Sequence, residues 1–338
     1  MLLSICIPNY NKPALLRNCL ESIYQSKLKS TMDFEICISD NSSTQKIDDV
    51  VKDYINKLKI NFNINKINIG VGANILKSVS MAKGKFVWII GNDDIVLPHT
   101  ISRLYKLLTL DEKIEFFFIN SFEVHSSIIL DEDMKFNLKN LKGNLKRRSL
   151  LSESKRLKFL DLIDPEVSWD FLLGLYLSVF KREKWVKNAD VVNNEKMNMP
   201  GTFSSFENTC PHIQIFAAAF TNSNAYFEKD PLIISTIGER DWKSLYHFIE
   251  IIRIPEILDL FRDKGLSLKK YLIYKNFSLR NYASYLIKMI IFRGDTGLKY
   301  FKIKKHLFNN LIFPNIYLSI FKPFFNFSHK LIRRKKNG

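Results

Sequence analysis

Strand-like apolar runs alternate with amphipathic helix patterns through the first 110 residues or so. The runs cover residues 2–7, 34–39 and 86–90, with a weaker run at 60–66, and apolar residues at helical spacing separate each run from the next. The connections between them are short. Such repeated units predict an α/β fold, with a mostly parallel sheet covered by helices on both faces and right-handed crossovers.

Polar side chains follow each of the main predicted strands. Asn9 ends the first strand, Asp40 ends the second, and Asn92, Asp93 and Asp94 follow the fourth. Because parallel strands share one carboxyl edge, these side chains should converge on one crevice, where open α/β sheets bind ligands. Two adjacent carboxylates suit a hard cation and the phosphates that it holds. The alternative is that they only cap the helix that follows.

Charge is distributed very unevenly along the chain. The 338 residues are 46% hydrophobic, which predicts a folded protein with a large core, and they carry a formal net charge of +17. Residues 264–338 contain 17 Lys or Arg and one acid, a net charge of +16, which leaves +1 for the rest. This asymmetry indicates an anionic partner for the C-terminal segment, either membrane lipid or nucleic acid.

The cysteines and the N-terminus narrow the cellular context. The four cysteines lack metal-ligand spacing, and Cys6, Cys19 and Cys37 lie in strand-like or helical apolar patterns, which predicts buried free thiols in a reducing compartment. Residues 1–4 have no basic region before the first strand, and no apolar run reaches about 18 residues. We therefore expect neither a signal peptide nor a spanning helix.

Gly70 and Gly72 are the only hint of a dinucleotide-binding loop. The pattern is G-x-G alone, it follows the third strand-like run, and no third glycine stands at the required place. A glycine-rich turn that opens a helix near the crevice explains the pair better.

The middle of the chain combines loop-like and core-like stretches. Residues 131–158 are polar and basic and predict a mobile loop or lid, 172–180 are apolar and predict a return to the core, and 188–199 predict another loop. A helix is expected to begin within 203–212 and to continue to Phe220. Glu207 and His212 stand near its start, where they could face a cleft. Alternatively, Glu207 favours the helix N-terminus and His212 is a partly buried, hydrogen-bonded histidine.

Five segments together resemble family 2 glycosyltransferases, which have the GT-A fold, a Rossmann-like sheet flanked by helices. They are SICIPNYN at 4–11, EICISDNSS at 35–43, NIG at 68–70, AKG at 82–84 and GNDDIVLP at 91–98. They occur in the family's order. The last segment is similar to a branch that includes abequosyltransferase-like enzymes of surface polysaccharide assembly. It also departs from the common pattern, which has an aspartate where Gly91 stands.

The resemblance implies roles for individual residues. It implies a divalent metal, Mg²⁺ or Mn²⁺, held by Asp93 and Asp94. It implies a catalytic base near the start of a later helix, where Glu207 is the nearest match and His212 is the alternative. The residues implied in nucleotide-sugar binding are Pro8, Asn9, Tyr10, Asp40, Asn41, Gly70, Asn74, Asn92 and Asp93.

The implied function is inverting transfer of a sugar from a nucleotide-sugar to a hydroxyl of a glycan acceptor, which a polyprenyl lipid would carry. We expect a GT-A domain over residues 1–245, with acceptor-side loops at about 128–206. Residues 246–338 would form a helical, basic and aromatic segment on an anionic membrane surface. The protein would then act on the cytoplasmic face of the inner membrane, in lipopolysaccharide or capsule assembly.

Three alternatives stand beside this interpretation. A pseudoenzyme that binds sugar nucleotides without transfer would account for Gly91 and for the loose match of the base. A nucleic-acid-binding protein would use the basic tail, but it leaves the acidic crevice unexplained and matches no nucleic-acid motif. For the tail itself, the alternative is a helical subdomain with solvated lysines.

Overall fold

The computed structural model describes residues 1–131, 136, 143–199, 201–238, 242–292 and 294–321. The basic cluster at 333–336 and the aromatic residues at 324–327, on which the expected membrane segment partly depends, lie outside the described residues. So do residues 132–135 and 137–142 of the expected loop.

The first half of the sheet is parallel, as predicted. Its strand order is β3-β2-β1-β4, and residue Asn9 at the end of β1 pairs with Asp40 at the end of β2. The four strands are β1 (Leu3–Asn9), β2 (Phe34–Asp40), β3 (Ile60–Ile64) and β4 (Phe86–Ile89).

The second half of the sheet is mixed. β9 runs antiparallel between β4 and β6, and β10 then pairs with β6 in a long parallel register. The antiparallel pairings are short, so the sheet is mostly parallel, as predicted. The remaining strands are β5 (Ile95–Val96), β6 (Ile114–His125), β7 (Lys146–Arg147), β8 (Lys155–Lys158), β9 (Ser178–Lys181) and β10 (Asn224–Ile237).

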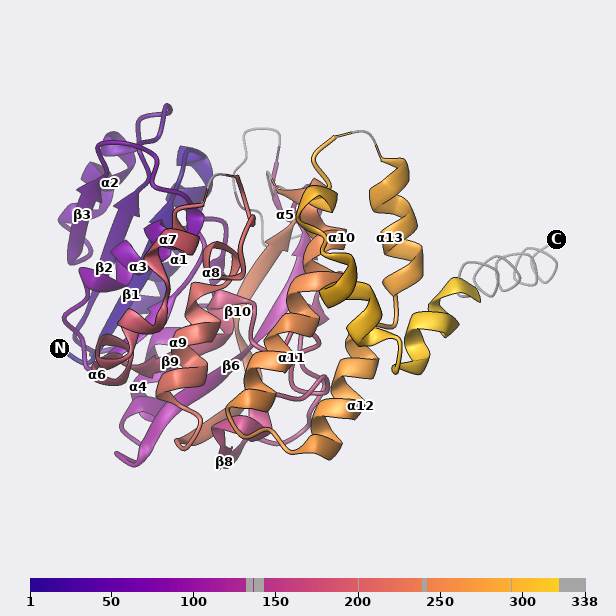
Figure 1. Ribbon diagram of the computed structural model, residues 1–338. Coiled ribbons are helices and arrows are strands. Elements are labelled where there is room, and N and C mark those ends of the chain that lie inside the picture. The colour runs from indigo at the N-terminus through magenta and orange to yellow at the C-terminus, as the bar shows by residue number, and fades with distance from the viewer. Residues whose placement is uncertain (132–135, 137–142, 200, 239–241, 293, 322–338) are drawn as a thin grey trace, which may run out of the picture.

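Helices α3, α8, α9 and α11 lie in front of the sheet in the view of Figure 1. The helices of the first 220 residues are α1 (Pro13–Lys27), α2 (Asp48–Ile55), α3 (Val71–Ser80), α4 (Thr100–Leu108), α5 (Ser126–Ile129), α6 (Arg182–Lys187), α7 (Asn194–Met197), α8 (Phe206–Thr209) and α9 (Pro211–Ala219).

The single helix expected over 203–220 is instead two helices. Helix α8 ends before Cys210, whose backbone is not helical (φ −140°, ψ 59°), and α9 begins at Pro211. Proline lacks a backbone N–H and is favoured in the first turn of a helix, so it starts a new helix here.

A large apolar core joins the sheet to its helices. Phe116 of β6 lies at its centre and makes edge contacts with Phe159, Phe216 and Phe220, with ring centroids 4.8, 5.0 and 5.3 Å away. Such edge-to-face geometry is favourable for aromatic rings. The four cysteines are free and buried, as predicted. Residues 172–180 contribute Leu172, Leu177, Val179 and Phe180 to the core, also as predicted.

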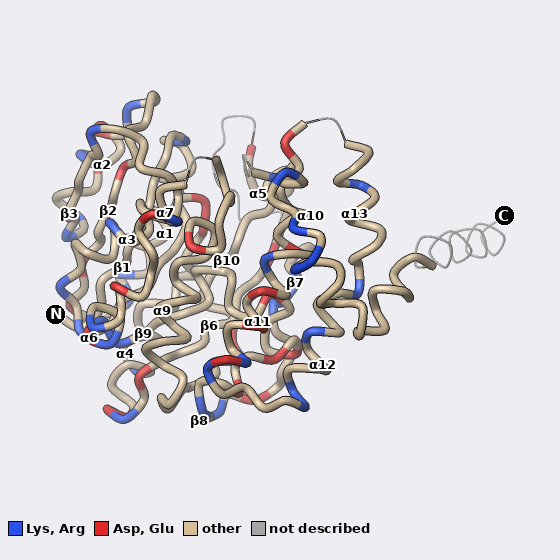
Figure 2. Tube along the Cα trace, viewed as in Figure 1, with Lys and Arg blue, Asp and Glu red and all other residues tan. Residues whose placement is uncertain are grey.

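The C-terminal helices are attached through α11 (Ile254–Asp263), which packs Ile257, Leu258 and Phe261 into the main core. A second, smaller core lies beyond it, beside the sheet in Figure 1. That core is built from α10 (Tyr246–Phe248), a π-helix (Ile249–Arg253), α12 (Leu268–Ser278), α13 (Tyr282–Ile291) and the segment that follows. Lys and Arg lie on both parts of the molecule (Figure 2).

Within the described part of the chain, none of the helices has the length and apolar character needed to cross a membrane.

Candidate active site

A chain of side-chain hydrogen bonds ties together the ends of β1, β2 and β4. Asn9 Nδ2 donates to Asp40 Oδ1 at 2.8 Å, and Asn9 Oδ1 accepts from Asn92 Nδ2 at 2.7 Å. A carboxylate can only accept, so Asp40 fixes the orientation of the Asn9 amide and leaves its oxygen for Asn92. Asn9 and Asp40 are almost fully buried. The convergence predicted from the strand ends is therefore present.

Asn74 reinforces the same edge from α3. Its Nδ2 donates to the carbonyl of Ser39 at 2.9 Å and to that of Asn9 at 3.3 Å, and its Oδ1 accepts from the Ser39 hydroxyl at 2.7 Å. Asn74 is buried, so its amide holds the backbone of β1 and β2 in place.

Asn41 fixes the entry to α3. Its Oδ1 accepts from the backbone N–H of Ile69 at 2.8 Å, and its Nδ2 donates to Asn68 Oδ1 at 2.8 Å. Gly70 precedes α3 with φ of 85°, a conformation that favours glycine. The glycine pair thus opens a helix beside the crevice, as predicted.

Gly72 lets α3 approach α8 closely. A Cβ atom there would lie 2.8 Å from Met197 Sδ and 3.0 Å from the carbonyl oxygen of Asn208. The small residue therefore sets the separation of the two helices.

The loop after β1 docks on the loop after β2. Asn11 Oδ1 accepts from the backbone N–H groups of Thr44 and Gln45 at 2.9 and 3.1 Å. Pro8 is half-buried, and the exposed Tyr10 follows Asn9 at the edge of the strand-end network.

The two acids after β4 have different environments. Asp94 is buried, and its Oδ2 accepts from the backbone N–H of Gly91 at 2.7 Å, which closes the turn. Asp93 is partly exposed. A Cβ atom at position 91 would lie 2.5 Å from Asp93 Oδ1, so glycine makes room for this carboxylate. Asp94 thus has a structural role in this turn, and Asp93 is the more accessible acid. The capping alternative is wrong, because His99 stands at the N-cap of α4 and no side chain caps that helix.

The protein ligands for a metal are few at this edge. In the part of the chain that the structure describes, no three His, Cys, Asp or Glu side chains gather closely enough to hold a metal ion. Mg²⁺ in enzymes that act on phosphates is commonly held by one or two carboxylates, with substrate phosphates and water completing the set. Asp93 with Asp94 fits a cation of that kind.

A cavity of about 250 Å³ opens beside Gly91, Asp93 and Asp94. Its other walls come from segments far away in the sequence. Those wall residues include Arg148, Trp169, Asp170, Tyr176, Phe203, Thr209, His212, Trp242, Tyr246 and Glu250. Most of them were not predicted as site residues, because they follow no periodic pattern or motif.

Arg148 forms the charged wall of this cavity. Its guanidinium is ion-paired with Glu123 and Asp170 and lies 4.7 Å from the centre of the Trp169 ring. Burial opposes the charge, but Asp170 and Glu123 outweigh this effect and raise the pKa of Arg148. The mobile loop expected over 131–158 is therefore wrong at 146–148, where β7 pairs with β6 and Arg148 is buried.

The two candidate bases occupy different positions. His212 lines the cavity, is buried, and has its Nε2 3.1 Å from the carbonyl oxygen of Leu173. Burial lowers the pKa of His212 to about 4, so it is neutral at pH 7. Its Nδ1 has no hydrogen-bond partner among the described residues. Glu207 is not among the residues that line the cavity, and its carboxylate is 3.4 Å from Lys196 Nζ.

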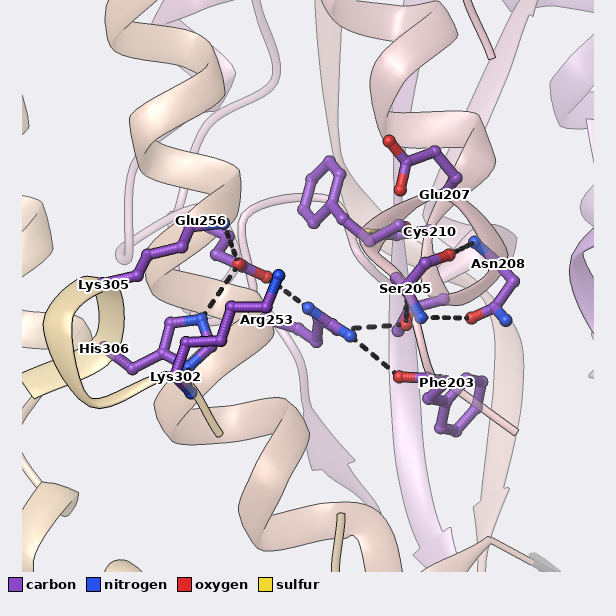
Figure 3. A network of polar contacts seen from close by, with 12 residues as sticks. Phe203, Ser205, Glu207, Asn208, Cys210, Arg253, Glu256, Lys302, Lys305 and His306 are labelled. Atoms are coloured by element: carbon purple, nitrogen blue, oxygen red, sulfur yellow. Dashed lines mark hydrogen bonds and ion pairs between the residues drawn. The ribbon is translucent and has the colours of Figure 1, made fainter. Parts of the chain in front are cut away.

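A buried arginine connects α8 to the C-terminal helices. Arg253 donates to the carbonyl of Phe203 at 2.9 Å and to the Thr209 hydroxyl at 3.2 Å, on either side of α8. It also pairs with Glu256 at 2.6 Å. Figure 3 shows this network, with the Glu207 carboxylate above Arg253 in the view and not joined to it.

Glu256 in turn contacts Lys305 and His306, which lie further along the chain. Its Oε1 accepts from Lys305 and lies 3.3 Å from His306 Nε2. Burial alone would raise the pKa of Glu256, but the His306 hydrogen bond and the charges of Arg253 and Lys305 lower it to about 2. The position of α8 thus depends on residues about a hundred positions later.

Comparisons with known proteins identify relatives of this chain. Residues 4–149 match the model of glycosyl transferase family 2. The chain is 26% identical to abequosyltransferase RfbV of Salmonella typhimurium over 285 residues, which are 80% of this chain and 78% of the relative. It is 34% identical to the uncharacterized glycosyltransferase MJ1057 of Methanocaldococcus jannaschii over 35% of this chain and 40% of the relative.

The fold is also similar to that of a solved structure. The crystal structure of S. aureus TarS 1-349 in complex with UDP superimposes with a TM-score of 0.56 and 14% sequence identity. The match covers 89% of this chain and 78% of that chain.

Replacing Glu256 by Gln should destabilise the protein in a pH-dependent way. The variant leaves Arg253 buried without its charged partner, which typically costs about 3–5 kcal/mol. Because the folded-state pKa is lowered to about 2, the stabilisation by Glu256 is fully present above its ordinary value of 4.5. This stabilisation is lost as the pH falls from 4.5 towards 2. Urea unfolding of both proteins at several pH values measures the difference.

Glu112→Gln is the matched control, since Glu112 is highly exposed and pairs with Lys85 at the surface. It should leave stability nearly unchanged. A destabilisation by Glu256→Gln that is equally large at pH 7 and pH 3 would contradict the assignment.

Proposed function

Because this chain is a glycosyltransferase with a family 2 domain over residues 4–149 and the GT-A fold, we propose that it transfers a sugar from a nucleotide-sugar to a lipid-linked glycan. The transfer goes to a hydroxyl group, inverts the anomeric carbon and belongs to bacterial surface polysaccharide assembly. The observation that carries this proposal is the Asp40–Asn9–Asn92 network, which presents Asp93 at the mouth of a cavity. The similarity to an abequosyltransferase over most of both chains supports it.

The donor would lie along the carboxyl edge of β1, β2 and β4. Pro8 and Tyr10 would line the site of the base, and the exposed Tyr10 ring offers a surface for stacking. Asp40 is occupied by Asn9 and Ser43, so it would act mainly by orienting Asn9 and, through it, Asn92. Asn92 and Asp93 would then approach the ribose and the diphosphate. The TarS structure that resembles this fold contains UDP.

Asp93, with Asp94, would hold Mg²⁺ or Mn²⁺. A bound cation supplies electrostatic stabilisation of the charge that develops on the departing diphosphate. The turn closed by Gly91 and Asp94 keeps the Asp93 carboxylate at the edge of the cavity, where the diphosphate would lie.

Glu207 would act as the catalytic base and take the proton of the acceptor hydroxyl as its oxygen attacks the anomeric carbon. The carboxylate stands on α8, whose last residue, Thr209, lines the cavity together with Phe203, which precedes the helix. Reaching the acceptor requires it to leave Lys196. His212 already lines the cavity, but a pKa of about 4 makes it a weak base at pH 7.

The C-terminal helices would rest on an anionic membrane surface. Exposed apolar side chains gather near the end of α13, where Ile290, Ile291 and Phe292 are 62, 73 and 67% exposed. The chain from residue 264 onwards carries almost all of the net positive charge. Apolar and basic residues together suit binding in the interface of an anionic bilayer.

Donor binding is tested by thermal shift against UDP, GDP, CDP and dTDP, each with and without Mn²⁺. One of them should raise the Tm, and more so with Mn²⁺, since a ligand at 100 times its Kd stabilises by about 2.7 kcal/mol. Asn92→Ala should weaken that binding, whereas Asn56→Ala, at the exposed end of α2, should not. If none of the four shifts the Tm, the donor site is wrongly assigned.

The base is tested by the release of nucleoside diphosphate from the matching nucleotide-sugar. Glu207→Gln should slow turnover by about 10²–10⁴-fold while donor binding is retained. The matched control is Glu195→Gln, on the exposed surface of α7. Normal turnover by Glu207→Gln would exclude Glu207 as the base. If only His212→Gln lost turnover, His212 would be the base instead. A wild-type protein that binds the donor without turnover would be a pseudoenzyme.

Membrane binding is tested by sedimentation of the full chain with vesicles that contain or lack phosphatidylglycerol. The wild type should sediment with the anionic vesicles at low salt, and less at high salt, because salt screens the charges. Ile291→Glu should reduce sedimentation, and the control Ile55→Glu, at an exposed position of α2, should not. A wild-type protein that stays in solution with anionic vesicles at low salt would refute membrane binding.

A further inference from the structure

A second, larger cavity adjoins the first. It has a volume of about 950 Å³, near the upper end of the ~300–1,000 Å³ typical of ligand pockets. The two cavities have five lining residues in common, which are Arg148, Trp169, Trp242, Tyr246 and Glu250. A ligand that reacts beside Asp93 in the first cavity could therefore continue into the second.

Aromatic side chains form much of the wall of the second cavity. Trp169, Trp242, Tyr246 and Tyr285 line it, together with the His247 ring, which lies 4.2 Å from that of Tyr285. The C–H bonds of a sugar ring pack well on aromatic faces. The hydroxyl groups around that sugar need polar partners at the edges of the rings.

Such polar groups are present on the same walls. His247 Nδ1 is buried and has no hydrogen-bond partner among the described residues. Burial, with Lys288 nearby, lowers the pKa of His247, so the ring is neutral near pH 7 and can accept a hydrogen bond from a hydroxyl. Glu250 and Asn281 also line the cavity.

The buried and partly buried charges of this cavity are paired. Arg148 pairs with Glu123, and Arg280 lies 3.6 Å from Glu250. The cations that remain, Lys146 and Lys243, are exposed. Matched internal charges favour a neutral ligand with many hydroxyl groups over a nucleotide or another polyanion.

We propose that the second cavity binds the sugars of the acceptor glycan that lie beyond the reacting one. The acceptor would run from Asp93, past Trp169 and Trp242, to Tyr285 of α13, and it would contain at least two sugars. This inference rests on the proposed transfer reaction. It adds a substrate class, an oligosaccharide rather than a single sugar, and it gives the C-terminal helices a part in acceptor recognition.

The test is binding of the full chain to an array of bacterial surface glycans that range from monosaccharides to longer oligosaccharides. The wild type should bind glycans of two or more sugars, and monosaccharides about tenfold more weakly or worse. Tyr285→Leu and Trp242→Leu remove the flat polar ring but keep an apolar side chain, and each should weaken binding about tenfold, or about 1.4 kcal/mol. Tyr105→Leu, at an exposed position on α4, is the control.

Nucleotide thermal shifts on the same variants separate this inference from the proposed function. Tyr285→Leu should keep the wild-type Tm shift with the donor nucleotide, because Tyr285 lines the second cavity and not the first, and that shift also shows that the variant is folded. Three results would overturn the acceptor site alone, provided that the wild type still binds the donor nucleotide. They are no glycan binding by the wild type, equal binding of monosaccharides and longer glycans, and unaltered glycan binding by both variants. A wild type that binds no nucleotide would instead remove the proposed function.

Discussion

The hydrogen bond from Asn9 to Asp40 is the contact on which the arrangement of this site depends. Two buried strands end side by side, and their last residues would be costly to bury without partners. The Asn9 amide donates a hydrogen bond to the Asp40 carboxylate, and the Asn9 side-chain oxygen accepts one from Asn92, which follows β4. An apolar residue in place of Asn9 or Asp40 would leave a buried polar group unmatched. The same bond thus stabilises the sheet edge and determines where Asp93 begins its turn.

The half of the site opposite this edge is assembled from distant parts of the chain. Arg148 directly follows β7, and its charge is balanced by ion pairs with Glu123 of β6 and with Asp170. Arg253 of the π-helix donates hydrogen bonds to Phe203, just before α8, and to Thr209, the last residue of α8. The sheet edge is therefore held by hydrogen bonds between strand ends, while the opposite wall depends on ion pairs between segments that are distant in the sequence.

The sequence predicted the first of these halves much better than the second. Apolar runs and helical patterns, with polar residues at strand ends, were enough to bring Asn9, Asp40 and Asn92 together, because parallel strands have a common edge. The break at Pro211 was missed, although proline is favoured in the first turn of a helix. The burial of Arg148 was missed as well, since a Lys-Arg-Arg run normally indicates a solvated surface. Its partners are 25 and 22 residues away and carry no motif.

Gly72 has a consequence for how the two halves could move. Without a side chain there, α3 rests almost directly on the backbone of Asn208, with no compressible layer between them. Helix α3 is itself held to β1 and β2 by Asn74. A displacement of α3 would therefore displace α8 as well, and the reverse. Occupation of the strand-end crevice and the orientation of α8 would then be mechanically linked.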